Sequence, residues 1–92
     1  MIKTFRHKGL KQLFEIGRSR LVAADLTRRL IRQLDLLNRA TGPSDMNLPG
    51  YRLHELKGDR KGTWSVAVSG NWRLTFTFEG EDARDVDLED YH

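Results

Sequence analysis

Residues 63–78, with the sequence Thr-Trp-Ser-Val-Ala-Val-Ser-Gly-Asn-Trp-Arg-Leu-Thr-Phe-Thr-Phe, decide the fold of this chain. Large apolar side chains alternate with small or polar ones on both sides of Ser69-Gly70-Asn71. Strict alternation with a period of two predicts strands, and a short loop containing glycine predicts that the two strands form a β-hairpin. One face of the hairpin is aromatic and aliphatic, so it needs a cover. The other face carries serine, threonine and Arg73, and we expect it to be open to a ligand.

Two helices are predicted before the hairpin. Residues 7–16 place apolar side chains close to helical spacing, and Gly17 is suited to end that helix. Residues 21–40 form the clearest helix, with Ser19 as a candidate cap and one apolar edge made by Leu26, Leu30, Leu34 and Leu37. Another face of this helix is either a solvated surface or a stripe that faces phosphates, and it carries Arg28, Arg32, Asp35 and Arg39.

Further short strands are expected on both sides of the hairpin. Residues 51–56 alternate in the same way, with Tyr51 on the apolar side and His54 on the polar side, and a last strand follows near Val86. Residues 1–5 are either a brief strand or an extended lead-in. Helices grouped before a mainly antiparallel sheet predict an α+β fold, in which both helices pack on one face of the sheet. We expect residues 1–92 to form a single domain.

Composition narrows the classes of function. Lysine and arginine outnumber aspartate and glutamate by 16 to 13, for a net charge of +3, and most of the cations lie in the first 39 residues. A basic half favours a polyanionic partner. The chain has no cysteine, which excludes disulfides and thiolate metal sites, and we expect a cytoplasmic protein by default. It has no apolar run of the roughly 18 residues that a membrane span needs, and we expect no signal peptide.

Two of the three histidines are candidates for chemistry. His7 is expected at the surface near a helix start, whereas His54 lies on the polar side of its strand and His92 is the last residue. A histidine has an ordinary pKa of about 6.5 and can exchange a proton near neutral pH. The alternatives are that His54 is a hydrogen-bonded structural residue and that His92 belongs to a frayed terminus. No two histidines have the spacing of a metal-binding pair, and we expect no metal or cofactor.

Cations accompany these histidines. Lys57, Arg73 and the arginines of the long helix could hold phosphates, and Asp90 could orient His92. A pair of proton-transfer groups with cations and without metal is the equipment for RNA cleavage by its own 2′-hydroxyl. The pattern therefore makes RNA cleavage a hypothesis. The chain has no glycine-rich phosphate loop and no serine–histidine–aspartate signature.

Several ordered motifs resemble the HigB toxins of the RelE/ParE superfamily of toxin–antitoxin systems. The most specific are Leu-Lys-Gly-Asp-Arg at 56–60, Asn-Trp-Arg at 71–73 and Asp-Tyr-His at 90–92. The stretches Tyr-Arg-Leu-His-Glu at 51–55, Gly-Thr-Trp-Ser-Val at 62–66 and the opening residues 1–10 fit the same family. The resemblance covers nearly the whole chain.

The resemblance implies a RelE-like microbial RNase fold and a ribosome-dependent mRNA endonuclease, which cuts mRNA in the ribosomal A site and stops translation. It assigns catalysis to His54, Asp90, Tyr91 and His92. It also implies that Lys57 and Arg73 contribute to phosphate binding. Ribosomal RNA would then be the partner of the basic stripe of the long helix, and we expect Arg28 and Arg32 to bind RNA there. Proton-transfer roles within the catalytic set stay open.

The resemblance also implies the partners. A HigA-type helix-turn-helix antitoxin would neutralise the toxin, and the complex would bind operator DNA. Two alternatives remain at this point. The first is a non-enzymatic ParE-like toxin that poisons DNA gyrase, against which His54 and the terminal Asp90-Tyr91-His92 argue. The second is a degenerate toxin kept as an antitoxin-binding module.

Overall fold

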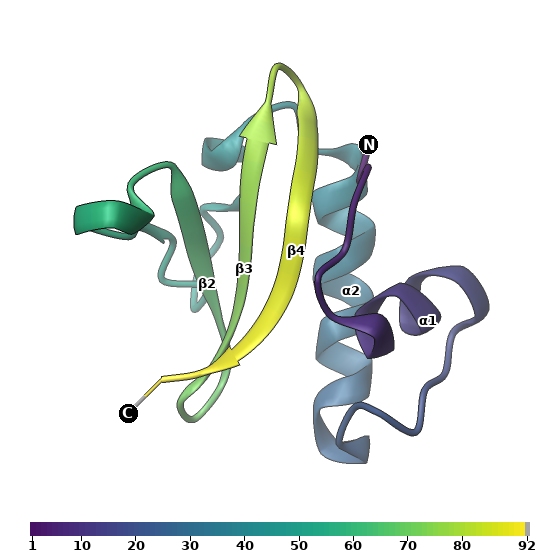
Figure 1. Cartoon of the computed structure of the whole chain (residues 1–92). Coiled ribbons are helices and arrows are strands. Elements are labelled where there is room, and N and C mark those ends of the chain that lie inside the picture. Colours follow the sequence, from purple (N-terminus) through teal and green to yellow (C-terminus); the bar gives the residue numbers. More distant parts are fainter. Residues whose placement is uncertain (92) are drawn as a thin grey trace.

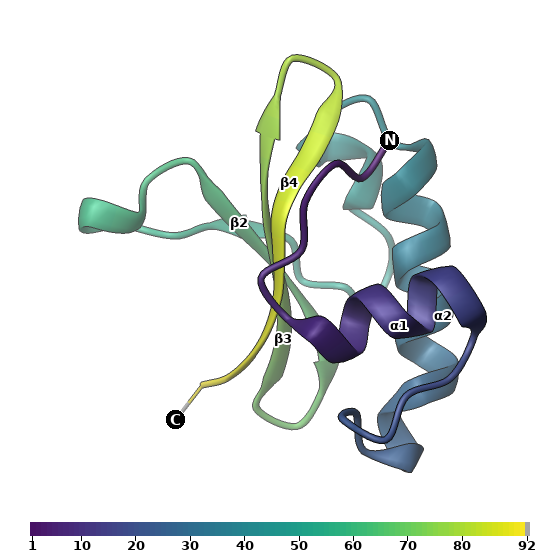
Figure 2. The same cartoon turned by 45° about the vertical axis from the view of Figure 1, so that its right-hand side comes forward.

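The computed structural model describes residues 1–91 and has two layers (Figure 1). One layer is a four-stranded antiparallel sheet with the strands in chain order, and both α-helices cover one face of it (Figure 2). In order, the elements are α1 (Lys8–Ile16), α2 (Ala24–Arg39), η1 (Pro43–Met46), β1 (His54–Glu55), η2 (Gly58–Arg60), β2 (Thr63–Ser69), β3 (Trp72–Glu79) and β4 (Asp82–Asp90). The predicted α+β architecture is confirmed.

The predicted hairpin is formed by β2 and β3. Trp64 pairs with Phe76 and Val66 pairs with Leu74, so their side chains share the face that meets the helices. The chain reverses after Ser69, which pairs with Trp72, and Gly70 in the loop has a φ of 56°. A positive φ is strained for residues with a Cβ, which explains the glycine at this turn.

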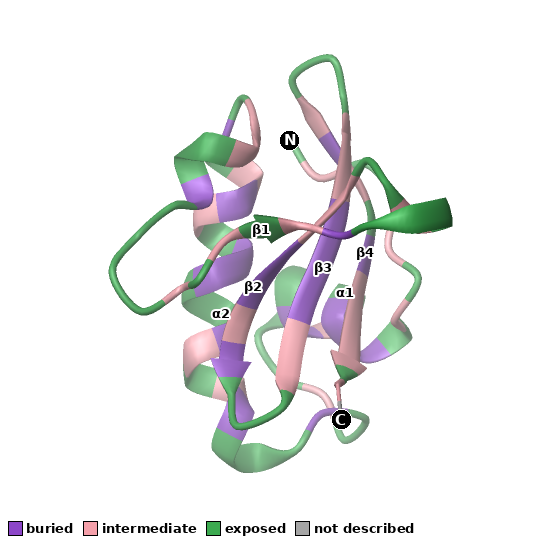
Figure 3. Cartoon of the chain, turned by 90° about the vertical axis from the view of Figure 1, so that its left-hand side faces the viewer, coloured by how far each residue is buried: buried purple, intermediate pink, exposed green. Residues whose placement is uncertain are grey.

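The core lies between α2 and the hairpin. The four leucines of the predicted apolar edge of α2 are at most 3% exposed, and Val66, Leu74 and Phe76 are fully buried against them. Burial of each such side chain stabilises the fold by about 1.5–3 kcal/mol. Figure 3 shows the same distribution, with buried residues gathered along β2, β3 and the inner side of α2.

The ends of the helices follow from local hydrogen bonds. His7 caps α1, because its Nδ1 accepts the N–H of Leu10 at 3.2 Å. Gly17 ends α1 with a φ of 78°, as expected.

The predicted start of the second helix at residue 21 is wrong, since α2 begins at Ala24. Ser19 caps the preceding turn instead, and its Oγ accepts the N–H of Leu21 at 3.0 Å.

β1 is shorter than the predicted strand over residues 51–56. Arg52 has a φ of 51°, which is incompatible with a continuous strand, so only His54 and Glu55 pair with β2. The chain nevertheless stays beside β2, because the N–H of Ala67 donates to the carbonyl oxygen of Tyr51 at 2.6 Å.

The first residues extend the sheet at its other edge. Ile2 and Phe5 form parallel bridges with Ala83 and Val86 of β4. This segment is therefore an extended lead-in with two isolated bridges to β4, which was one of the two expectations for it. No helix within residues 1–91 is long and apolar enough to cross a membrane.

Candidate active site on the polar face of the sheet

The sheet face opposite the helices, here called the polar face, carries a row of polar side chains. His54 pairs with Ser65, Ser65 pairs with Thr75, and Thr75 pairs with Asp87 of β4. Paired residues of antiparallel strands project to the same face, so this row crosses all four strands. With strands about 4.8 Å apart, the backbones of β1 and β4 are separated by roughly 14 Å.

A bulge in β4 brings its polar residues onto this face. Thr77 pairs with Arg84 but Thr75 pairs with Asp87, so β4 carries one extra residue in between. Asp85 adopts a φ of 53°, and its N–H donates to Oγ1 of Thr4 at 2.8 Å. The extra residue reverses the alternation of side chains. As a result, Asp87 and every second residue after it project to the polar face.

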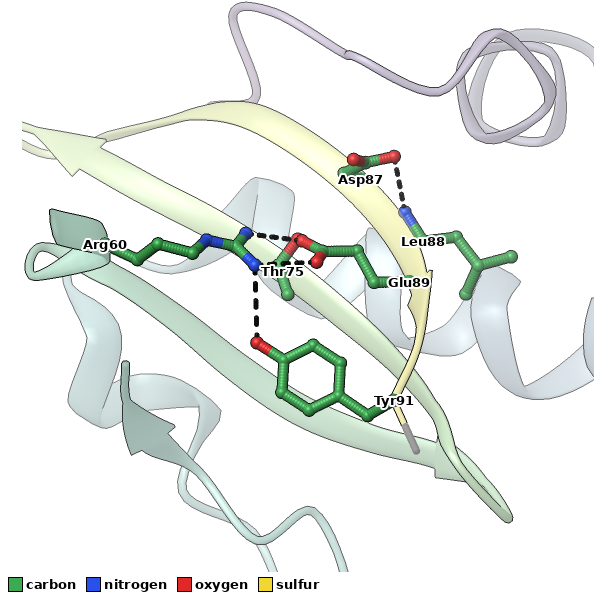
Figure 4. Close-up of polar contacts among 6 residues, drawn as sticks. All are labelled: Arg60, Thr75, Asp87, Leu88, Glu89 and Tyr91. Carbon is green, nitrogen blue, oxygen red and sulfur yellow. Dashed lines mark hydrogen bonds and ion pairs between the residues drawn. The ribbon is translucent and has the colours of Figure 1, made fainter. Parts of the chain in front are cut away.

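The polar face is less open than the sequence indicates. Ser65 and Thr75 are 0% and 1% exposed, so the expected solvent-facing surface is partly covered. Side chains from the ends of the sheet fold back over its centre (Figure 4). Thr75 lies beneath them, and its hydroxyl donates to Oε2 of Glu89 at 2.6 Å.

These covering side chains form a cluster, here called the Arg60 cluster, which consists of Arg60, Thr75, Glu89 and Tyr91. Arg60 reaches from η2 across the sheet and donates to both carboxylate oxygens of Glu89, at 2.8 and 2.6 Å. Its Nη1 also lies 3.4 Å from the hydroxyl of Tyr91 (Figure 4). Neither Arg60 nor Glu89 is among the site residues expected from the sequence. Arg60 ends the motif Leu-Lys-Gly-Asp-Arg and Glu89 directly precedes Asp-Tyr-His, but a contact across 29 residues has no local signal.

The charges of the cluster stabilise one another. The hydrogen bond from Arg60, supported by that from Thr75, holds the pKa of Glu89 below its ordinary value, against the effect of desolvation. The same hydrogen bond raises the pKa of Arg60. Glu89 is therefore ionised at neutral pH, and its carboxylate forms an ion pair with Arg60.

His54 is exposed at the edge of this face. Its Nδ1 lies 3.3 Å from the carbonyl oxygen of Arg52. A carbonyl oxygen can only accept, so this contact is a hydrogen bond when Nδ1 carries the proton. In the neutral ring, Nε2 then has a lone pair that can take a proton.

Two of the four predicted phosphate ligands, Lys57 and Arg73, differ in their surroundings. Lys57 is exposed and shares with Lys61 a shallow depression of about 390 Å³ beside β1. Arg73 is half-buried on β3, between Ala67 and Glu89 in the strand register. Its Nε and Nη1 are buried and have no hydrogen-bond partner among residues 1–91. Arg73 is thus a half-buried cation on the polar face, with two donors that have no partner among residues 1–91.

The C-terminal residues divide between the two faces. Tyr91 follows Glu89 by two residues and turns toward Arg60 on the polar face. Asp90 pairs with Trp72 and has the opposite alternation, so the structure does not bring it onto the polar face with His54. His92 lies outside the described residues.

Arg28 and Arg32 are both exposed on α2. Since α2 covers the opposite face of the sheet, these two arginines lie in a different layer from His54 and Tyr91 (Figure 2). Arg39 of the same stripe pairs with Asp35 at 3.0 Å. The stripe is therefore an exposed basic surface separate from the polar face.

The hollow on the polar face is small. It has a volume of about 30 Å³ beside the Arg60 cluster and is lined by Arg6, Arg60, Thr63, Thr75, Thr77, Asp85, Asp87 and Glu89. This space can hold water but not a nucleotide. Among residues 1–91 no group of three or more histidine and carboxylate side chains could hold a metal ion.

Comparison with known proteins points to one family. Residues 3–92 match the model of the HigB-like toxins, described as the RelE-like toxin of the type II toxin–antitoxin system HigB. The chain is 48% identical over 92 residues to a Proteus vulgaris protein named Endoribonuclease HigB, and the match covers 100% of both chains. It is 36% identical over 78 residues to a Vibrio cholerae serotype O1 protein named Toxin HigB-1, covering 83% of this chain and 82% of that relative.

Proposed function

We infer that this chain is an endoribonuclease which cleaves mRNA on the ribosome. The premise is that the chain belongs to the HigB-like family of RelE-like type II toxins. The full-length similarity to a protein named Endoribonuclease HigB carries this proposal. The polar face supports it, because it carries a histidine, a tyrosine and two arginines. The ParE-like gyrase poison is not proposed, since the matching family and both relatives are HigB toxins.

The proposed reaction transfers a phosphoryl group within the RNA. The 2′-hydroxyl loses its proton to a base, and its oxygen attacks the adjacent phosphorus. The bond to the 5′-oxygen then breaks, and an acid protonates that oxygen as it leaves. The products are a 2′,3′-cyclic phosphate and a 5′-hydroxyl. General acid–base assistance accelerates such a step by about 10²–10⁴-fold per group.

The proposed catalytic set combines residues of the polar face with Lys57 and the last residues of the chain. His92 is proposed as the main proton-transfer group and His54, which can take a proton at Nε2, as its partner. Arg73 and Lys57 are proposed to bind the phosphate, because positive charge stabilises the additional negative charge of the transition state. Tyr91 can donate a hydrogen bond to the RNA. Asp90 is proposed to orient His92.

The basic surface of α2 is proposed to bind ribosomal RNA. Arg28 and Arg32 are exposed and lie in the helical layer, so they are unsuited to hold the phosphate that reacts on the polar face. Contacts between arginine and phosphate strengthen binding in a manner that depends on salt. In this proposal, α2 binds the ribosome and the polar face of the sheet cleaves the mRNA.

Membership of a type II toxin family implies an antitoxin partner. We propose a HigA-type helix-turn-helix protein in this role, with operator DNA bound by the complex and not by the toxin alone. The toxin would act in the cytoplasm, where ribosomes and mRNA are found.

Cleavage of a defined mRNA by the purified protein tests the proposal. The mRNA is presented free and on ribosomes with an empty A site, to the wild type and to the His92→Ala variant. We expect cuts in the A-site codon only with ribosomes and the wild type. Intact mRNA with the wild type, together with DNA damage when the protein is expressed in cells, would favour a gyrase poison instead.

A further inference from the structure

The Arg60 cluster joins two motifs that the proposed mechanism leaves unconnected. Arg60 is the last residue of Leu-Lys-Gly-Asp-Arg, and Glu89 directly precedes the terminal Asp-Tyr-His. The two parallel contacts between them, at 2.8 and 2.6 Å, form the fork by which a guanidinium holds a carboxylate in one orientation. The end of β4 is thereby fixed to the turn before β2.

The carboxylate of Glu89 is held from two sides. Oε2 accepts from both Arg60 and Thr75, each at 2.6 Å, while Oε1 accepts from Arg60 alone. The side chain of Glu89 is 21% exposed and that of Arg60 is 40% exposed. Partial shielding from water strengthens these contacts relative to those of a surface pair. The guanidinium therefore has a defined position over the sheet.

This fixed guanidinium makes one more contact, at 3.4 Å from the hydroxyl oxygen of Tyr91. Arginine can only donate, so the phenol oxygen accepts and its own O–H remains available as a donor. Figure 4 shows the ring of Tyr91 lying over the strands with its hydroxyl directed at Arg60. The contact thus selects one orientation of the ring and of the segment that carries it.

We propose that Arg60 is a positioning residue, which acts through Tyr91 and sets the orientation of this side chain for RNA cleavage. Glu89 and Thr75 hold Arg60 in place for this task. The inference rests on the proposed endoribonuclease function and adds to it a residue that does not itself touch the reacting phosphate. Misplacement of a catalytic side chain by about 1 Å can reduce a rate by as much as about 100-fold.

A double-mutant cycle separates positioning from a structural role. Single-turnover cleavage on ribosomes is measured for the wild type, Arg60→Gln, Tyr91→Phe and the double variant, as a function of ribosome concentration. We expect Arg60→Gln to lower the maximal rate about tenfold or more, with the concentration at half-saturation unchanged. In the Tyr91→Phe background the same substitution should change the rate less than twofold. Losses that multiply in the double variant would overturn the inference.

Two controls accompany the cycle. Arg60→Lys keeps the positive charge but cannot make the two parallel hydrogen bonds to Glu89. We expect its cleavage rate to lie between those of Arg60→Gln and the wild type. Arg18→Gln removes an exposed arginine that lies between α1 and α2, outside the basic stripe of α2 and the polar face, and we expect wild-type cleavage. Full activity of Arg60→Gln, or a loss in Arg18→Gln as large as its own, would contradict the assignment.

Fluorine NMR supplies a readout that does not depend on activity. The chain has two tyrosines, so protein labelled with 3-fluorotyrosine gives signals from Tyr51 and Tyr91, which Tyr51→Phe assigns. Arg60→Gln should shift the Tyr91 signal and leave that of Tyr51 in place. An unmoved Tyr91 signal would refute positioning even if cleavage falls. A wild type that leaves mRNA intact would instead refute the proposed function, and the NMR result would still decide the contact.

Discussion

Replacing Glu89 with glutamine tests the energetic weight of the Arg60 cluster. The substitution keeps the shape of the side chain and removes its charge. The side chains of this ion pair are 40% and 21% exposed, with contacts at 2.8 and 2.6 Å. Hydrogen bonds to charged groups contribute about 1.5–3 kcal/mol and exposed pairs about 0.2–1 kcal/mol, so we expect a loss of about 1–2 kcal/mol. Asp35→Asn is the control, because the Asp35–Arg39 pair is 68% and 69% exposed, and it should cost about 0.3–0.5 kcal/mol.

Urea unfolding at several pH values measures both effects. The pKa of Glu89 is lower in the folded chain than its ordinary value of 4.5, so its charge stabilises the fold above that pH. This contribution is lost as the pH falls through the depressed pKa. The difference in unfolding free energy between wild type and Glu89→Gln should therefore be full at neutral pH and close on acidification. Equal losses in the two variants, or a difference that does not change with pH, would refute the reasoning.

Three further predictions concern the core, the polar face and the C-terminus. Leu30→Ala empties a fully buried position and should lower the unfolding free energy by about 2–5 kcal/mol. Ile31→Ala, at a position that is 37% exposed, should lower it far less. Equal losses of unfolding free energy in urea would show that the wrong face of α2 had been assigned to the core. Arg73→Ala should abolish most cleavage but leave the melting temperature nearly unchanged, because its buried donors have no partner among residues 1–91; a large drop in melting temperature would contradict this. A C-terminal tag should impair cleavage with the fold intact, while an N-terminal tag should be tolerated; equal toxicity of both tagged forms in growing cells would exclude a terminal active site.

Much of the fold could be predicted because its signals are local. The alternation in residues 63–78 gives β2 and β3, and the spacing of four leucines gives the buried edge of α2. Gly17 ends α1 with the positive φ that glycine adopts most readily. These features depend on periodicities of two and 3.6 residues, which the sequence displays directly.

The errors arose where a tertiary contact overrides a local preference. Ser19 has the chemistry of a helix cap, but it caps a turn and α2 starts later. Arg52 falls in an alternating stretch, yet its left-handed backbone interrupts the strand. The bulge at Asp85 depends on a contact with Thr4, more than 80 residues away, so its effect on which residues of β4 face the site could not be predicted.

The candidate site was predicted in its parts but not in its arrangement. His54 and Tyr91 lie on the polar face, whereas Asp90 has the opposite alternation. The ion pair that covers the centre of that face joins residues 29 positions apart. Such a contact becomes visible only when the strand order and register are known.

The most direct test of the central claim, that the polar face cleaves RNA, is the single-turnover rate of A-site mRNA cleavage by His54→Ala relative to His7→Asn. His7 caps α1 away from the polar face, and asparagine preserves such a cap. The account predicts that His54→Ala loses about 10²–10⁴-fold in rate while His7→Asn cleaves like the wild type. Wild-type cleavage by a folded His54→Ala protein would contradict it.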